Sequence, residues 1–175
     1  LFRLAREAGF DNINMDLIIG LPGEDIGDVR QTMERLTELQ PDNVTIHSLA
    51  IKRAARLNIF REYYRDMKMT NTQEHMELCE EYCRGMGLAP YYLYRQKNMS
   101  GGFENTGWTK PGFENLYNIC IMEELCSILA AGAGGSTKLV RRDGGRNERL
   151  VAPKYPTEHI ESIERICGGK EKITT

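Results

Sequence analysis

Asp16 is the residue whose type and surroundings most clearly suggest chemistry. It interrupts the apolar run Ile13–Ile19, which ends at the turn Gly-Leu-Pro-Gly over residues 20–23. A run of this kind is typical of a strand buried on both faces, as in parallel sheets and barrels. Because an unpaired buried carboxylate is unfavourable, we expect Asp16 to have a partner, a bound ligand or a shifted pKa. The alternative is a structural carboxylate paired with a backbone amide or an arginine.

A glycine-rich turn and a basic run are the next candidates for ligand binding. The turn Gly132–Gly135, followed by Ser136, would let a ligand approach the backbone, and its successive amides could hold an anion. It lacks the spacing of a Walker loop or a dinucleotide fingerprint, so a tight helix-to-strand turn is the alternative. The basic run could bind ligand carboxylates, although such runs are usually solvated. Its members are Lys52, Arg53, Arg56, Arg61 and Arg65.

The cysteines and histidines give no complete catalytic or metal-binding set. Cys79 and Cys83 have a CxxxC spacing, but a methionine stands where an iron–sulfur motif needs its third cysteine. Both thiols fall on the apolar stripe of a predicted helix, so we expect them in the core. His47 is either a core histidine or part of a pocket wall, and His75 and His159 are predicted at helix surfaces. No nucleophile–base pair follows from the sequence, and the catalytic residues stay unassigned.

The hydrophobic pattern predicts a strand–helix–strand unit near the start of the chain. Strands are expected over residues 10–19 and 44–51, and a helix begins at Glu24 or Asp25 between them. This order is typical of a right-handed βαβ unit, which places Asp16 and the basic run near the carboxyl ends of parallel strands. An irregular segment is expected over residues 96–116. The other expected elements are a helix from 71 or 72 to 85–87, a strand over 89–95, a helix over 117–131, a hairpin over 138–142 and 148–152, and a helix over 156–166.

The composition is typical of a soluble globular protein, with 41% apolar residues, 27% charged residues and a formal net charge of −2. This balance gives no case for binding nucleic acid or a membrane surface. The sequence contains no apolar run long enough to span a bilayer and no secretory signal, so its five cysteines are expected to be reduced in a cytoplasmic protein. The sequence starts at Leu1 within a helical pattern, which favours a fragment of a longer chain.

Several stretches resemble one known enzyme family. The stretch Asn14–Gly23 resembles the strand-five motif of radical S-adenosylmethionine enzymes of the oxygen-independent coproporphyrinogen III oxidase type, a group that also includes heme chaperones. The stretches Tyr91–Met99 and Glu104–Trp108, with Tyr117–Ile119 and the glycine-rich turn, resemble its HemZ-type coproporphyrinogen dehydrogenase branch. The resemblance covers nearly the whole chain and is weakest after Arg141.

The resemblance implies an α/β fold: the C-terminal part of a partial (βα)6 TIM-like barrel plus an α+β C-terminal extension. Residues 1–70 would supply the last βα units of the barrel, and residues 71–175 the extension. In this family a four-iron–four-sulfur cluster cleaves S-adenosylmethionine, and the resulting radical drives oxidative decarboxylation of coproporphyrinogen III to protoporphyrinogen IX in heme biosynthesis. The family's CxxxCxxC cluster loop is absent here. No metal ligand is therefore assigned, the chain alone is expected to be inactive, and the electron donor stays unknown.

The resemblance also implies site residues. It places Asp16 on a contact to S-adenosylmethionine and Ala50 on a backbone contact to the same cofactor. The end of the glycine-rich turn matches a further cofactor contact, at Gly134, Gly135 and Ser136. Arg53 and Arg56 are the hypothetical ligands of the porphyrinogen carboxylates. The alternatives are a heme chaperone of the same superfamily and a non-catalytic βα interaction module.

Overall fold

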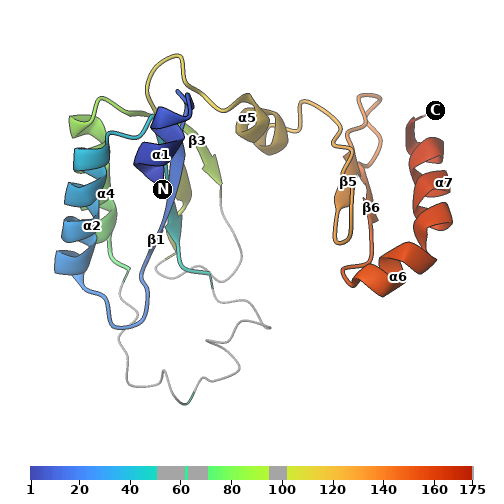
Figure 1. The fold of residues 1–175 in the computed structure, drawn as a ribbon, viewed down its shortest axis with the longest axis horizontal. Coiled ribbons are helices and arrows are strands. Elements are labelled where there is room, and N and C mark those ends of the chain that lie inside the picture. The colour runs from blue at the N-terminus through green and yellow to red at the C-terminus, as the bar shows by residue number, and fades with distance from the viewer. Residues whose placement is uncertain (51–61, 63–70, 95–101, 175) are drawn as a thin grey trace. The chain divides into compact units, whose positions relative to one another are not determined.

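The computed structural model describes residues 1–50, 62, 71–94 and 102–174 (Figure 1). The chain divides into two compact units, Leu1–Asn115 and Leu116–Thr175, and each is described by itself. Their mixture of strands and helices confirms the predicted α/β class. The predicted domain boundary at residue 70 falls inside the first unit, and the assignment of residues 71–175 to a family extension stays a prediction. No helix of the described residues is long and apolar enough to cross a membrane.

The first unit is built on a four-stranded sheet (Figure 1). Its strands, in spatial order, are β1 (Asn14–Ile19), β2 (Asn43–Ser48), β4 (Asn105–Thr109) and β3 (Ala89–Tyr94). The strands β1 and β2 are parallel and are joined through helix α2 (Ile26–Leu39), so the predicted strand–helix–strand unit is confirmed. Strand β4 runs antiparallel to both neighbours. Helix α1 (Phe2–Glu7) precedes β1, and helix α4 (Gln73–Gly85) precedes β3.

Helix α2 begins where its sequence provides a cap. The Asp25 carboxylate accepts hydrogen bonds from the backbone N–H groups of Gly27 and Asp28, at 2.7 and 3.3 Å, and Asp28 accepts one in return from the Asp25 N–H at 3.0 Å. This capping box satisfies amide groups that the first turn leaves without helical partners. The helix ends at Gln40, whose left-handed φ of 53° stops the hydrogen-bond ladder.

One hydrophobic core joins the sheet to α2 and α4, which lie side by side against it (Figure 1). Met33 of α2 and Val44 and Ile46 of β2 are at most 1% exposed. Cys79 and Cys83 of α4 are completely buried in the same core, as predicted. Burial raises the pKa of each thiol to about 12. Both therefore act as small apolar side chains, not as reactive or metal-binding thiolates.

This burial predicts which cysteines react in the native protein. We expect iodoacetamide at pH 8 to modify the exposed Cys126 and Cys167 quickly and to leave Cys79 and Cys83 unmodified, because only an accessible thiolate attacks the reagent. The modified sites are identified by peptide mass spectrometry. In urea all the cysteines should react. Rapid native labelling of Cys79 or Cys83 would show that the core of the first unit is not packed as described.

The first unit differs from the sequence prediction at β4 and at His75. The segment 96–116, predicted as irregular, contains strand β4. Glycine and asparagine are poor strand formers, but β4 pairs with a strand on each side, and this pairing outweighs its weak local preference. His75, predicted at a helix surface, is only 4% exposed, and its Nδ1 lies 2.7 Å from the Thr72 hydroxyl oxygen.

The second unit combines one hairpin with short helices. Its elements are α5 (Leu116–Met122), β5 (Ser136–Leu139), β6 (Glu148–Val151), α6 (Pro156–Glu161) and α7 (Ile163–Thr174). The antiparallel pairing of β5 with β6 confirms the predicted hairpin. The helix predicted over residues 117–131 ends early, and Glu124 just beyond it has a left-handed φ of 52°. At the other end, the helix predicted over residues 156–166 is divided into α6 and α7, and α7 extends to Thr174.

Candidate cofactor cleft

The side chains of β1 alternate between the core and an open face. Met15, Leu17 and Ile19 pack on the core, whereas Asp16 and Ile18 lie on the opposite face. The Asp16 side chain is 63% exposed. The prediction that this strand is buried on both faces was therefore wrong, since the described helices α2 and α4 pack on one face of the sheet and no described residue covers Asp16. The carboxylate is accessible to a ligand and needs no buried counter-ion.

Asp16 lies in a row of paired residues that crosses the whole sheet. The strand register places it beside Thr45, then Gly107, then Tyr92. Asn14 links the row together: its amide donates to Asp16 Oδ1 at 2.7 Å, and its Oδ1 accepts from the Thr45 hydroxyl at 3.2 Å. The Tyr92 hydroxyl lies 3.4 Å from Thr45 Oγ1. Burial raises the pKa of Tyr92, so this residue stays neutral near pH 7 and acts as a hydrogen-bonding group.

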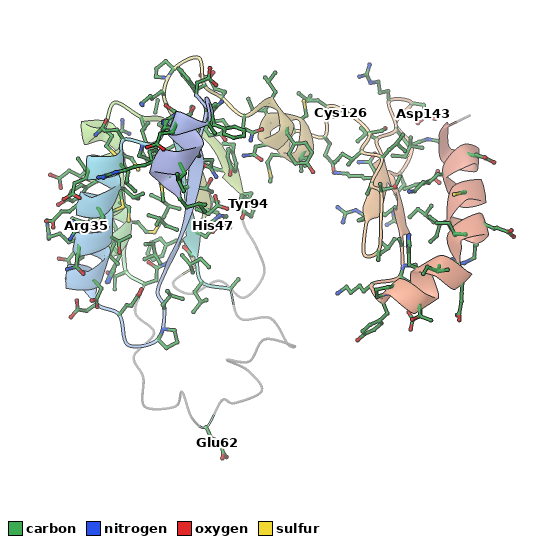
Figure 2. All side chains as sticks on the ribbon, in the orientation of Figure 1. Arg35, His47, Glu62, Tyr94, Cys126 and Asp143 are labelled. Carbon is green, nitrogen blue, oxygen red and sulfur yellow. The ribbon has the colours of Figure 1, made fainter. Side chains whose placement is uncertain are left out.

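A second polar group lies two residues further along the strands, toward the carboxyl ends of β1 and β2. The Tyr94 hydroxyl is 2.8 Å from His47 Nδ1, and Figure 2 labels both side chains. The other ring nitrogen, Nε2, lies 3.8 Å from Asp16 Oδ1. The amide oxygen of Asn105 accepts the Ser48 N–H at 2.8 Å, which fixes the end of β2 beside this group. His47 thus forms part of a pocket wall, one of its two predicted alternatives.

These side chains line a cleft of about 360 Å³. Its lining residues are Asp16, Ile18, His47, Ser48, Leu49, Ala50, Tyr94 and Asn105. The structure thus brings together two of the predicted site residues, Asp16 and Ala50, at the carboxyl ends of parallel strands, where barrel enzymes place their sites. Tyr94 and Asn105 were not predicted as site residues. The tyrosine-rich composition of β3 was the only signal for Tyr94, and Asn105 of β4 had none, because nothing local to the sequence shows that β4 and β3 follow β2 in the sheet.

The glycine-rich turn lies in the second unit, and its amides bond within that unit. The Gly134 N–H donates to the Pro153 carbonyl at 2.8 Å, and the Gly135 N–H donates to the Gly132 carbonyl at 3.2 Å. Gly132 and Gly134 both have left-handed φ values, 84° and 73°, which explains the glycines. Ser136 follows as the exposed first residue of β5. A cofactor contact at Gly134, Gly135 and Ser136 stays a prediction.

The remaining predicted site residues receive no structural test. Arg53 and Arg56 lie outside the described residues. Among the residues that the structure does describe, no three His, Cys, Asp or Glu side chains gather closely enough to hold a metal ion.

Comparison with solved structures supports the fold. The chain matches "Coproporphyrinogen III oxidase (HemN) from Escherichia coli is a Radical SAM enzyme" with a TM-score of 0.61 and 16% sequence identity, covering 94% of this chain and 37% of that one. The chain therefore shares its fold with part of that protein, as predicted. No family model matches the chain.

Sequence comparison identifies the relatives more closely. The oxygen-independent coproporphyrinogen-III oxidase-like protein HemZ of Bacillus subtilis is 39% identical over 171 residues, which cover 98% of this chain and 34% of that protein. The heme chaperone HemW of Lactococcus lactis is 28% identical over 96% of this chain and 42% of that protein. The chain thus spans about a third to two fifths of the length of these relatives. The predicted resemblance to the oxygen-independent coproporphyrinogen III oxidase family, and to HemZ within it, is confirmed.

Proposed function

We propose that this chain forms the S-adenosylmethionine-binding edge of a radical enzyme that decarboxylates coproporphyrinogen III to protoporphyrinogen IX. The observation that carries the proposal is the cleft that brings Asp16 and Ala50 together at the carboxyl ends of β1 and β2. The similarity to HemZ along nearly the whole chain supports it.

The residues of the cleft fit part of a nucleoside-type cofactor. The accessible Asp16 carboxylate can accept hydrogen bonds from ribose hydroxyl or amino groups and offset a positive sulfonium. Ala50 is small, so a flat adenine ring can approach the backbone there. A cleft of about 360 Å³ is in the size range of small-molecule sites. When bound and cleaved in such enzymes, the cofactor supplies the radical that takes a hydrogen atom from a propionate side chain.

The described residues do not fit the iron–sulfur cluster. The CxxxC pair Cys79 and Cys83 is buried in the core, and its high pKa disfavours the thiolates that ligate iron. The cluster ligands and the complete reaction are accordingly assigned to the full-length protein. Arg53 and Arg56 are proposed to bind the substrate's carboxylates, because they follow β2 closely in the sequence and arginine pairs bidentately with carboxylates. A cytoplasmic location is part of the same proposal.

Cofactor binding by the full-length protein tests the proposal. Asp16→Ala should weaken S-adenosylmethionine binding about 10- to 100-fold, because a hydrogen bond to a charged group is lost. Anaerobic equilibrium dialysis measures the dissociation constant. The control is Glu38→Ala, which removes an exposed carboxylate from α2 and should leave binding unchanged. Equal affinity of Asp16→Ala and the unaltered protein would refute the assignment of this cleft. Formation of 5′-deoxyadenosine with coproporphyrinogen III then tests the reaction.

A heme chaperone is the second candidate function. The HemW relative, similar along 96% of this chain, favours it. A heme titration followed by absorbance separates the two functions. Stoichiometric heme binding without any conversion of coproporphyrinogen III would favour the chaperone, whereas product formation would favour the enzyme. A non-catalytic interaction module would show neither.

A further inference from the structure

His47 connects the two sides of the cleft. It stands on β2, and the Tyr94 side chain reaches it from β3, across the intervening strand β4 (Figure 2). The two rings meet edge to face, with centroids 6.0 Å apart. On its other side, His47 Nε2 faces the Asp16 carboxylate at 3.8 Å. The His47 side chain is 23% exposed, against 63% for Asp16, so the imidazole is the more firmly enclosed of the two.

The two neighbours of His47 favour one tautomer of the neutral ring. If Nδ1 carried the proton, the lone pair of Nε2 would face the negative Asp16 carboxylate, which is unfavourable. If Nε2 carries the proton, Nδ1 accepts a hydrogen bond from the Tyr94 hydroxyl, whose oxygen lies 2.8 Å away. The Nε2–H group then faces Asp16. The Asp16 side chain is 63% exposed, so it has room to rotate toward Nε2, which lies 3.8 Å from its Oδ1.

The two carboxylate oxygens of Asp16 differ in their hydrogen-bond donors. Asn14 Nδ2 donates to Oδ1 at 2.7 Å, and His47 Nε2 approaches the same oxygen. One carboxylate oxygen has two lone pairs, so it can accept both donors. No described residue donates to Oδ2. Asn14 and His47 can therefore hold one oxygen in place while the other remains available to a ligand in the cleft.

We infer that His47 is a positioning residue, which Tyr94 orients and which in turn aims Asp16 at the cofactor. The inference rests on the proposed function, because it concerns how the same carboxylate binds S-adenosylmethionine. The role inferred for His47 is exerted through Asp16. Its Nε2–H group donates to Asp16 Oδ1 and restricts the Asp16 side chain before the cofactor binds. Less conformational entropy of Asp16 is then lost on binding.

Two amide variants of His47 in the full-length protein distinguish the roles of its two ring nitrogens. The amide nitrogen of glutamine can reach the place of Nε2, whereas that of asparagine reaches only the place of Nδ1. His47→Asn should weaken S-adenosylmethionine binding about tenfold, and His47→Gln should restore it to within about twofold. Tyr94→Phe should cost about threefold, because His47 loses its orienting hydroxyl. His159→Gln, a histidine substitution in the second unit, is the matched control.

The outcomes distinguish this inference from the proposed function. If Asp16→Ala weakens binding while both His47 variants bind normally, the positioning role is refuted and the cofactor assignment stands. Equal losses in His47→Asn and His47→Gln also refute it, since the rescue depends on the Nε2 donor. If Asp16→Ala itself has no effect, the cofactor assignment fails and the inference fails with it.

The tautomer gives a readout that does not depend on the cofactor. In the full-length protein labelled with ¹⁵N-histidine, the His47 signals are those that His47→Gln removes. We expect the Nε2–H tautomer in the unaltered protein and a shift toward Nδ1–H in Tyr94→Phe. An Nδ1–H tautomer in the unaltered protein would overturn the inference.

Discussion

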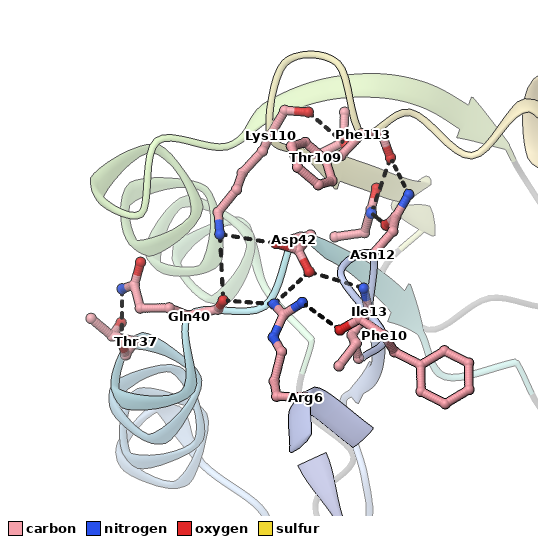
Figure 3. Close-up of polar contacts among 11 residues, drawn as sticks. Arg6, Phe10, Asn12, Ile13, Thr37, Gln40, Asp42, Thr109, Lys110 and Phe113 are labelled. Atoms are coloured by element: carbon pink, nitrogen blue, oxygen red, sulfur yellow. Dashed lines mark hydrogen bonds and ion pairs between the residues drawn. The ribbon is translucent and has the colours of Figure 1, made fainter. Parts of the chain in front are cut away.

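Replacing Asp42 by alanine should lower the free energy of unfolding of the first unit by about 3 kcal/mol. Asp42 is 4% exposed. Its carboxylate accepts the Ile13 N–H at 2.9 Å and pairs with Arg6 at 2.5 Å and Lys110 at 3.1 Å (Figure 3). Removing it leaves two cations and a backbone amide without this acceptor. Arg6 and Lys110 are about one-third exposed, which keeps the loss near the lower end of the usual range for buried pairs.

Asp42 matters because it joins three separate segments. Arg6 belongs to α1, Ile13 immediately precedes β1, and Lys110 immediately follows β4. The Asp42 backbone strengthens the junction, since its N–H donates to the Ile13 carbonyl at 3.1 Å and its carbonyl accepts the Lys110 N–H at 2.9 Å. Urea unfolding monitored by circular dichroism measures the loss. The control is Glu38→Ala, which removes a similar but exposed pair with Arg35 and should change stability by less than about 0.5 kcal/mol.

The Asp42 pairing should also depend on pH. Burial alone would raise the pKa of Asp42, but hydrogen bonds from Ile13, Arg6 and Lys110 together hold it below its usual value of 3.8. A carboxyl group with a lowered folded-state pKa stabilises the fold above its unfolded-state pKa, and this stabilisation is lost as the pH falls through the folded-state pKa. The stability difference between unaltered protein and Asp42→Asn should therefore be constant above about pH 5 and shrink below about pH 4. A difference independent of pH would contradict the ion-pair explanation.

Gly107→Ala should destabilise the first unit by about 2 kcal/mol, because the added methyl group has no room. A Cβ at position 107 would lie 1.9 Å from Cε1 and 2.4 Å from Cδ1 of Tyr92, whose ring lies across the glycine. Tyr92 would have to leave this place. It would then lose its approach to Thr45 and its stacking on Tyr94, whose ring centroid is 6.2 Å away. Thermal or urea unfolding measures the change.

A second substitution checks the cause of this loss. Replacing Tyr92 by alanine in the Gly107→Ala background should cost much less than the sum of the two single changes, because the clash no longer exists. Gly85→Ala is the control. A Cβ at Gly85 meets no atom within 4 Å, so alanine at this helical position should be neutral or stabilising by up to about 1 kcal/mol. Simple additivity of the two changes would show that Gly107 is needed for another reason.

Local sequence patterns predict several elements of the first unit and the apolar faces of its helices. The strand–helix–strand order, the cap at Asp25 and the burial of Cys79 and Cys83 follow from hydrophobic periodicity and short-range hydrogen bonds. These features depend on residues within a few positions of one another, so a pattern can show them. The same periodicity was misleading for Asp16, because it indicates an apolar strand but not whether one face or both are covered.

The contacts of Asp16, Asp42 and Gly107 follow from the assembled sheet and from no local pattern. Strand β4 has a weak local signal, yet its pairing brings Tyr94 to His47 and lays Tyr92 over Gly107. Asp42 likewise meets its partners only once α1 and the end of β4 come together. Such contacts join residues far apart in the chain, and the energy that selects them comes from burial and pairing in the assembled sheet, which no single stretch of sequence contains.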